Sequence, residues 1–211
     1  PKGSTALDFL SAVIDLLKEG GYSKITVAEG SGRPWVPTKN VFNKIGLSAK
    51  MAEMDIPLLD LDQSEYADVV INGDYLDEVA YPKDLNSFDK IIYIPTMKTH
   101  FVAGFSMSLK LVVGFTHLFD RFKLHADNNM FVSQRSVEMG IPVQPDLIIM
   151  DGRISFVSGG PAIGLAVHPG LIMASGDSTA IDVQGVKFLQ NYAAVNHLTG
   201  DAWTLPQIKT A

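Results

Sequence analysis

The chain alternates between hydrophobic residues at helical spacing and short, uninterrupted hydrophobic runs. Near its start, apolar side chains recur every three or four residues from Leu7 to Leu17, and Gly20-Gly21 follows, which predicts a helix that ends there. Five runs typical of buried strands come later, separated by helical segments: "KITVAEGSG", "IPLLDLD", "KIIYIP", "PDLIIMDG" and "LIMASGD". This alternation predicts an α/β fold with a mostly parallel sheet, helices on both of its faces and Rossmann-like layering.

No repeat, low-complexity tract or linker interrupts the 211 residues, so we expect a single α/β domain over residues 1–211. Residues 62–90 are less regular, and Asn72-Gly73 predicts a hairpin or insert there. A helical stretch is expected over residues 105–124, and a peripheral tail over residues 195–211.

Polar residues stand at the ends of the predicted strands. The first strand ends in Glu29-Gly30-Ser31-Gly32, another in Lys98 and His100, a third in Asp151-Gly152, and the last in Gly176-Asp177. In open parallel sheets, ligands bind outside the carboxyl ends of the strands, so Lys98, His100, Asp151 and Asp177 are expected to converge. Turns after strands are often polar for no functional reason, but four such ends together favour a real site.

Two glycine-rich loops invite comparison with phosphate-binding motifs. "EGSG" lacks the third glycine of a dinucleotide loop, and "SGGPAIG" lacks the Gly-Lys-Ser/Thr of a P-loop. Either loop can present backbone N–H groups to an anion, and either can equally be an ordinary turn.

Basic residues follow one line through the otherwise apolar segment 107–125. On a helix that turns about 100° per residue, Lys110, Gly114, His117, Arg121 and His125 share one stripe that holds no acidic residue. The alternative is an amphipathic helix with one solvated face. A basic stripe with a glycine suits a phosphate, a carboxylate or a polyanionic cofactor. His100, His125 and Asp151 are candidate metal ligands, although the histidines lack the i, i+4 spacing of helical metal sites.

Composition excludes several classes of function. The net charge of −6 argues against a general nucleic-acid binder, and the lack of cysteine excludes thiolate metal sites and cysteine nucleophiles. No apolar run approaches the roughly 20 residues that cross a bilayer, so no membrane partner is expected. The first residues lack the long apolar stretch of a signal peptide, which favours a cytoplasmic location.

Four motifs in a fixed order carry a resemblance to a known family. "IPTMKTH", "SLKLVVGFTHLFDRFKLH", "LIIMDGRISFVSGGPAIG" and "SGDSTAIDV" together resemble the domain-of-unknown-function 362 family, over about Ser4 to Gln190. The family's Lys-Asn pair is Lys110-Leu111 here, so any role of that amide is missing. Many relatives carry a ferredoxin-like cysteine segment that this chain lacks, so a redox link would require an iron–sulfur partner protein.

The resemblance points to a set of site residues without naming a reaction, substrate or cofactor. They are Lys98, Thr99, His100, Lys110, Gly114, Arg121, His125, Asp151, Gly152, Gly160, Pro161, Gly164, Asp177 and Asp182.

Three functions are considered for these residues, and polyanion binding through the basic stripe is the least favoured of them because the chain is acidic overall. The first is an enzyme in which Lys98, Lys110 and Arg121 hold a small anionic ligand. His100 or His125 then transfers a proton, and Asp151 or Asp177 orients a histidine or holds a cation. The alternative is a non-catalytic module that binds a metal or cofactor and works with an iron–sulfur partner.

Overall fold

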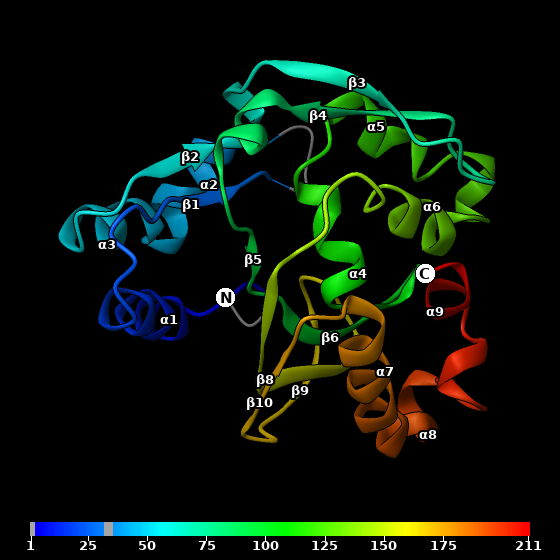
Figure 1. Ribbon diagram of the computed structural model, residues 1–211. Helices are drawn as coiled ribbons and strands as arrows, with labels where there is room; N and C mark the ends of the chain where they lie inside the picture. The colour runs from blue at the N-terminus through cyan, green and yellow to red at the C-terminus, as the bar shows by residue number, and fades with distance from the viewer. Residues whose placement is uncertain (1–2, 32–35) are drawn as a thin grey trace.

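A computed structural model describes residues 3–31 and 36–211 of the chain (Figure 1). Its largest sheet is built around one long strand, β8 (Leu147–Gly159), with the strand order β10-β8-β6-β7. The other strands of this sheet are β5 (Ile92–Tyr93), β6 (Thr96–His100), β7 (Gly104–Ser106), β9 (Gly164–Val167) and β10 (Leu171–Ser175).

The α/β fold is confirmed, and the direction of each strand follows from how it is connected. β5 and β6 run parallel to β8, as expected for strands joined through a crossover that contains helices. β9 is antiparallel to the last part of β8 because a short turn joins them into a hairpin, and β10 continues in the same direction along the first part of β8. β7 is antiparallel to β6 because a short connection joins these two strands.

Two small sheets accompany the large one. β1 (Val27–Glu29) pairs in parallel with β2 (Leu58–Asp60). β3 (Tyr66–Val70) and β4 (Glu78–Pro82) form the hairpin predicted around Asn72-Gly73. The buried carboxylate of Glu138 accepts the backbone N–H groups of Asp74 and Tyr75, which fixes the tip of the hairpin.

Helices cover both sides of the large sheet (Figure 1). On one side, Leu10 and Ile14 of α1 (Leu7–Glu19) pack against α2 (Thr38–Ile45) and α3 (Leu47–Glu53). The main core lies on the other side, where Met97 and Met150 of the sheet meet Val186 of α7. The helices on this side are α4 (Ser108–Leu111), α5 (Leu118–Lys123), α6 (Val132–Glu138), α7 (Ser178–Leu189), α8 (Ala193–Asn196) and α9 (Pro206–Thr210).

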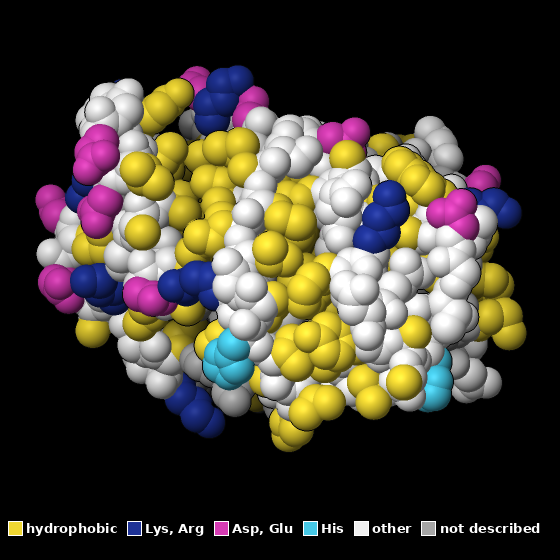
Figure 2. Space-filling model, turned by 90° about the horizontal axis from the view of Figure 1, so that it is seen from below, with side chains coloured by type: hydrophobic (Ala, Val, Ile, Leu, Met, Phe, Trp, Pro, Cys, Tyr) yellow, Lys and Arg dark blue, Asp and Glu magenta, His cyan; other side chains and the backbone are white. Residues whose placement is uncertain are grey.

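The face seen from below carries many hydrophobic side chains, with charged side chains more frequent toward the α1 end (Figure 2). β9 and β10, at the bottom of Figure 1, contribute the exposed Leu165 and Ile172. In the described part of the chain, no helix combines the length and hydrophobicity that crossing a bilayer requires.

Residues 195–211 are not a peripheral tail. Leu198, Ala202 and Ile208 are buried in the main core. The Gln207 amide donates hydrogen bonds to the carbonyl oxygens of Ala103 and Phe105. The elements in this stretch are too short to show a hydrophobic period, so their burial is not visible in the sequence.

The helix predicted over residues 105–124 is broken. α4 ends at Leu111, and one 3-10 turn, η3 (Val112–Gly114), follows it. His117 then adopts an extended conformation (φ −59°, ψ 150°), and its N–H donates to Ala80 of the hairpin rather than to a helical carbonyl. The stripe drawn through a continuous helix is therefore wrong, and each of its residues has to be placed separately.

Candidate functional site

Three residues predicted for the site lie together, and we call Lys98, His100 and Lys110 the basic cluster. Lys98 and His100 alternate with the buried Thr99 along β6, so their side chains leave the strand on the same face. β7 pairs Ser106 with Lys98 and leads into α4, which carries Lys110. The charge of Lys110 acts on both other members, and all three side chains keep partial exposure to solvent.

Lys98 is held in place by two acceptors. Its Nζ donates to the carbonyl oxygen of Gly3 at 2.9 Å and to Oγ1 of Thr96 at 2.5 Å. Burial, and then the positive charge of Lys110, lower the pKa of Lys98 to about 8, although Glu29 acts in the opposite direction. Near neutral pH this amine is charged, and it loses its proton far more easily than an ordinary lysine.

Lys110 has no such support. Its side chain forms no hydrogen bond or ion pair with any residue in the described ranges, 3–31 and 36–211. Burial lowers its pKa to about 8. Lys110 therefore presents up to three N–H donors next to a second lysine, and no acidic side chain in the described structure pairs with it.

His100 is a fixed, neutral imidazole. Its Nδ1 accepts the backbone N–H groups of Val102 at 3.2 Å and Ala103 at 3.1 Å, so the ring proton resides on Nε2. Burial and the charges of Lys110 and Lys98 lower the pKa of His100 to about 3. At neutral pH, His100 can donate a hydrogen bond from Nε2 but cannot change protonation state easily.

Glu29 is a member of this neighbourhood that the sequence interpretation did not select. It ends β1, and its Oε1 accepts the N–H of Gly30 at 2.9 Å. The protein atoms around Glu29 raise its pKa by desolvation, while the hydrogen bond from Gly30 and the charges of Arg121 and Lys98 lower it. Glu29 is nevertheless an exposed residue, so its carboxylate is accessible to solvent. The only signal in the sequence was its position in "EGSG", at the carboxyl end of a strand.

Arg121 was predicted to bind the anion, but its guanidinium group forms its hydrogen bonds with other parts of the protein. Only 4% of Arg121 is exposed, and its Nε donates to the carbonyl of Thr116 at 2.9 Å. Its two other nitrogens donate to the carbonyl of Ser31, to Oδ1 of Asp62 and to the carbonyl of Gly114. We call these contacts the arginine clamp, because they hold the end of β1 against the segment after α4.

Gly114 belongs to this clamp and does not open space for a ligand. A Cβ atom at Gly114 would lie 3.1 Å from Oε1 of Glu29, and one at Gly30 would lie 2.2 Å from the carbonyl oxygen of Gly114. The glycine therefore allows two segments of backbone to approach each other.

The proposed metal ligands do not come together. His125 is exposed, and its Nδ1 lies 2.6 Å from Oδ1 of Asn129, although its charge still acts on His100. The buried carboxylate of Asp151 is bound by Nε and Nη2 of Arg153, each at 3.0 Å, and Arg153 also pairs with Asp8. Within the described residues, no group of three His, Asp or Glu side chains is placed to hold a metal ion.

The two remaining carboxylates act at helix starts. Asp182 is fully buried and accepts the N–H groups of Ser108 at 2.8 Å and Leu109 at 2.9 Å, which fixes the start of α4 and so the base of Lys110. Burial raises the pKa of Asp182 to about 7. Asp177 caps α7 by accepting the N–H of Ala180 at 2.9 Å.

The other predicted residues shape the backbone around the cluster. Thr99 Oγ1 donates to the carbonyl of Phe156 at 3.2 Å. A Cβ at Gly160 would lie 2.0 Å from the carbonyl oxygen of Thr99, and one at Gly164 would lie 2.2 Å from that of Ser158. At Gly152 a Cβ would press on Met97 at 3.1 Å. These positions are explained by close packing next to β6.

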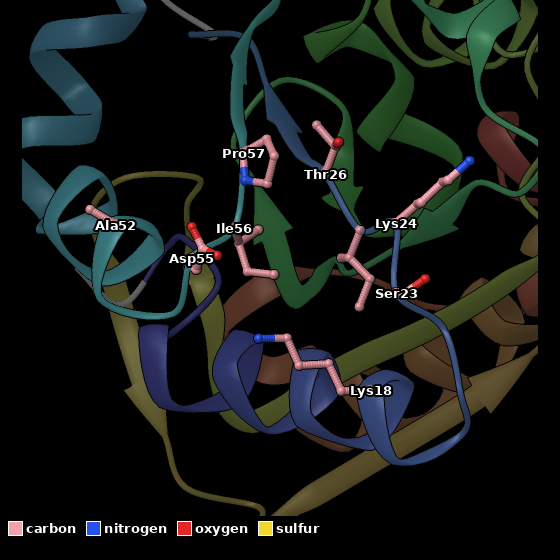
Figure 3. Close-up of a pocket in the computed structure, with 9 residues that line it drawn as sticks. Lys18, Ser23, Lys24, Thr26, Ala52, Asp55, Ile56 and Pro57 are labelled. Atoms are coloured by element: carbon pink, nitrogen blue, oxygen red, sulfur yellow. The ribbon is translucent and has the colours of Figure 1, made fainter.

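Two clefts in the described structure lie elsewhere. The larger, of about 710 Å³, is at the amino ends of β1 and β2, where Lys18 donates to the carbonyl of Met54 at 3.0 Å (Figure 3). The smaller, of about 270 Å³, lies beside the start of α7. Neither is lined by the basic cluster, and the larger lies at the end of β1 opposite Glu29.

Comparisons with known proteins agree with the motif order. The model of a family described as domain of unknown function (DUF362) matches residues 1–187. A thylakoid-associated protein from Synechocystis sp. is 25% identical over 190 residues, which cover 88% of this chain and 57% of that protein. The chain therefore spans little more than half the length of this relative. No solved structure matches the chain.

Proposed function

Because this chain belongs to the domain-of-unknown-function 362 family, whose name assigns no reaction, we propose a function from the site itself: the basic cluster binds a small anion, which is the substrate of an enzyme. The observation that carries this proposal is Lys110, a largely surrounded cation without a partner among the described residues. An unpaired cation costs free energy in the folded state, and an anion placed between Lys98 and Lys110 would remove that cost.

Each member of the cluster has a separate task in this proposal. Lys98 and Lys110 bind the carboxylate or phosphate of the ligand. The Nε2–H of His100 donates to an oxygen on which negative charge develops, a role that a permanently neutral imidazole fills well. Glu29, with its raised pKa, takes and returns a proton on the substrate. Arg121 acts only through the backbone that it holds.

Binding can be tested with simple anions. We expect isothermal titration calorimetry to detect inorganic phosphate or acetate binding to the wild-type protein, with at least tenfold weaker binding to Lys110→Ala. Lys187→Ala is the matched control, because Lys187 is exposed on α7. Equal binding by the two variants would contradict the proposal.

Proton transfer needs a separate experiment. In heavy water, NMR can follow the exchange of the protons next to the carbonyl of pyruvate and 2-oxobutyrate. If Glu29 is the base, Glu29→Gln should slow exchange about a hundredfold, while Glu65→Gln, at an exposed position, should not.

A non-catalytic binding module is the second candidate, and one observation favours it. His100 cannot exchange protons readily near neutral pH, because Nδ1 is occupied and its pKa is about 3. Anion binding without exchange of either 2-oxo acid would support this candidate. The redox link, the iron–sulfur partner and the cytoplasmic location stay predictions.

A further inference from the structure

Two exposed hydrophobic side chains border the basic cluster, and we call Phe101 and Ile163 the apolar pair. Phe101 is 77% exposed and Ile163 is 87% exposed. Single exposed hydrophobic residues are common and need no explanation. These two differ because the backbone contacts around them connect both to the same cluster.

Phe101 directly adjoins His100. The two rings are stacked, with centroids 5.4 Å apart and planes inclined by 5°. The N–H of Phe101 donates to the carbonyl of Gly160 at 3.3 Å, which joins the end of β6 to the turn that carries Ile163. The turn is closed by a hydrogen bond of 2.8 Å from the N–H of Gly160 to the carbonyl of Ile163.

The same turn also reaches the surroundings of Lys98. A Cβ at Gly3 would lie 2.1 Å from the carbonyl oxygen of Pro161, so these two stretches of backbone are in close contact. The carbonyl of Gly3 is also an acceptor for Lys98 Nζ. The turn at residues 160–163 therefore lies near His100 on one side and near the acceptor of Lys98 on the other. This places the apolar side chain of Ile163 next to the positively charged cluster.

We propose that the anion bound by the basic cluster carries an apolar chain: the ligand is a free single-chain amphiphile, with its carboxylate or phosphate at Lys98 and Lys110 and its chain against Phe101 and Ile163. This inference rests on the proposed function for the charged end of the ligand. The complementarity is twofold, since Lys110, which has no partner among the described residues, matches an anion, and the uncovered side chains of Phe101 and Ile163 match a hydrocarbon chain. A short, fully polar anion would leave the apolar pair in water.

The test is a chain-length series. Acetate, butyrate, hexanoate and octanoate, each below its micelle-forming concentration, are titrated into wild-type protein and four variants. We expect affinity to rise about two- to fourfold for each added CH₂ group that reaches the apolar pair. Phe101→Ala and Ile163→Ser should flatten this dependence, whereas Lys110→Ala should weaken every member of the series by a similar factor.

Phe119→Ala is the matched control. Phe119 is also a phenylalanine, is 71% exposed, and contacts His117 rather than His100. It should preserve the dependence on chain length. Because Phe101 and Ile163 are so exposed, their variants should unfold at the wild-type temperature, and circular dichroism checks this.

The outcomes separate this inference from the proposal on which it rests. Acetate binding that depends on Lys110, with no gain from longer chains, would overturn the amphiphile and leave the anion site standing. Octanoate binding that is unaffected by Lys110→Ala would overturn the anion site. Binding to vesicles of phosphatidylglycerol and phosphatidylcholine, without binding to monomeric octanoate, would replace the free amphiphile by a membrane surface and so overturn the inference.

Discussion

The basic cluster and the arginine clamp use the same kind of side chain in opposite ways. In the clamp, Arg121 donates to three backbone carbonyls and to Asp62, so the protein itself satisfies its charge. In the cluster, the Lys110 side chain has no acceptor among the residues that the structure describes, and its positive charge lowers the pKa of Lys98. Both places hold a positive charge surrounded by protein, although Arg121 is buried and Lys110 keeps partial exposure. The partners decide which cation supports the fold and which remains available to a ligand.

The largest effect is expected from removing the clamp. Arg121→Ala should lower the free energy of unfolding by about 3 to 5 kcal/mol, because buried carbonyls and Asp62 lose their donor. Arg121→Lys should recover little, since one ammonium cannot replace the guanidinium geometry. Urea denaturation measures this, with Lys187→Ala as the control. A loss below about 1 kcal/mol would mean that the clamp does not hold these segments together.

A smaller effect of opposite sign is expected in the cluster. Lys110→Met keeps most of the aliphatic stem and removes a charge that has no described partner. We expect the free energy of unfolding at pH 7 to stay the same or to rise by up to about 1 kcal/mol. The same denaturation assay measures it. A clear loss of stability would show that Lys110, like Arg121, supports the fold.

The smallest expected effect is a change with pH in the stability difference between Lys110→Met and the wild-type protein. The lysines titrate near pH 8 in the folded protein and near 10.5 when unfolded, so between these values the unfolded chain binds more protons. The stability contributed by these groups therefore rises with pH in this window. From pH 8 to pH 10.5 the free energy of unfolding of Lys110→Met should rise less than that of the wild-type protein. Any stability advantage of the variant at pH 7 should therefore become smaller as the pH increases. Urea denaturation at several pH values tests this, and parallel curves would contradict the lowered pKa of Lys110.

The sequence predicted the α/β fold from the alternation of helical and strand-like segments, which is a local property. It placed Lys98 and His100 at the end of one strand, and in the structure both lie within β6, on the same face. Lys110 was predicted from a stripe on one helix, and it lies beside them because β7 leads directly into α4. The stripe through Arg121 and His125 failed because it assumed one continuous helix. The break at His117 depends on a hydrogen bond to Ala80, and nothing in the local sequence reveals such a distant partner.

Glu29 and Asp151 both show that a position at a strand end does not reveal whether a carboxylate is already paired. Asp151 was selected as a strand end, but Arg153, two residues later, occupies its carboxylate. Glu29 also ends a strand, and the sequence could not show that its carboxylate would share an environment with Lys98 from another sheet. Strand ends identify candidates, and only the three-dimensional structure shows which of them are already paired.

Lys98 completes its hydrogen bonds with Gly3, and the turn at Gly160 closes against the strand that carries Lys98. The site thus depends on segments that leave the ribosome at widely separated times. A fragment that ends before residue 160 cannot assemble it, so binding of the proposed anion would report that these segments have come together. The proposed ligand would then protect from proteolysis only those molecules in which the segments are assembled, because bound ligand stabilises only the folded state.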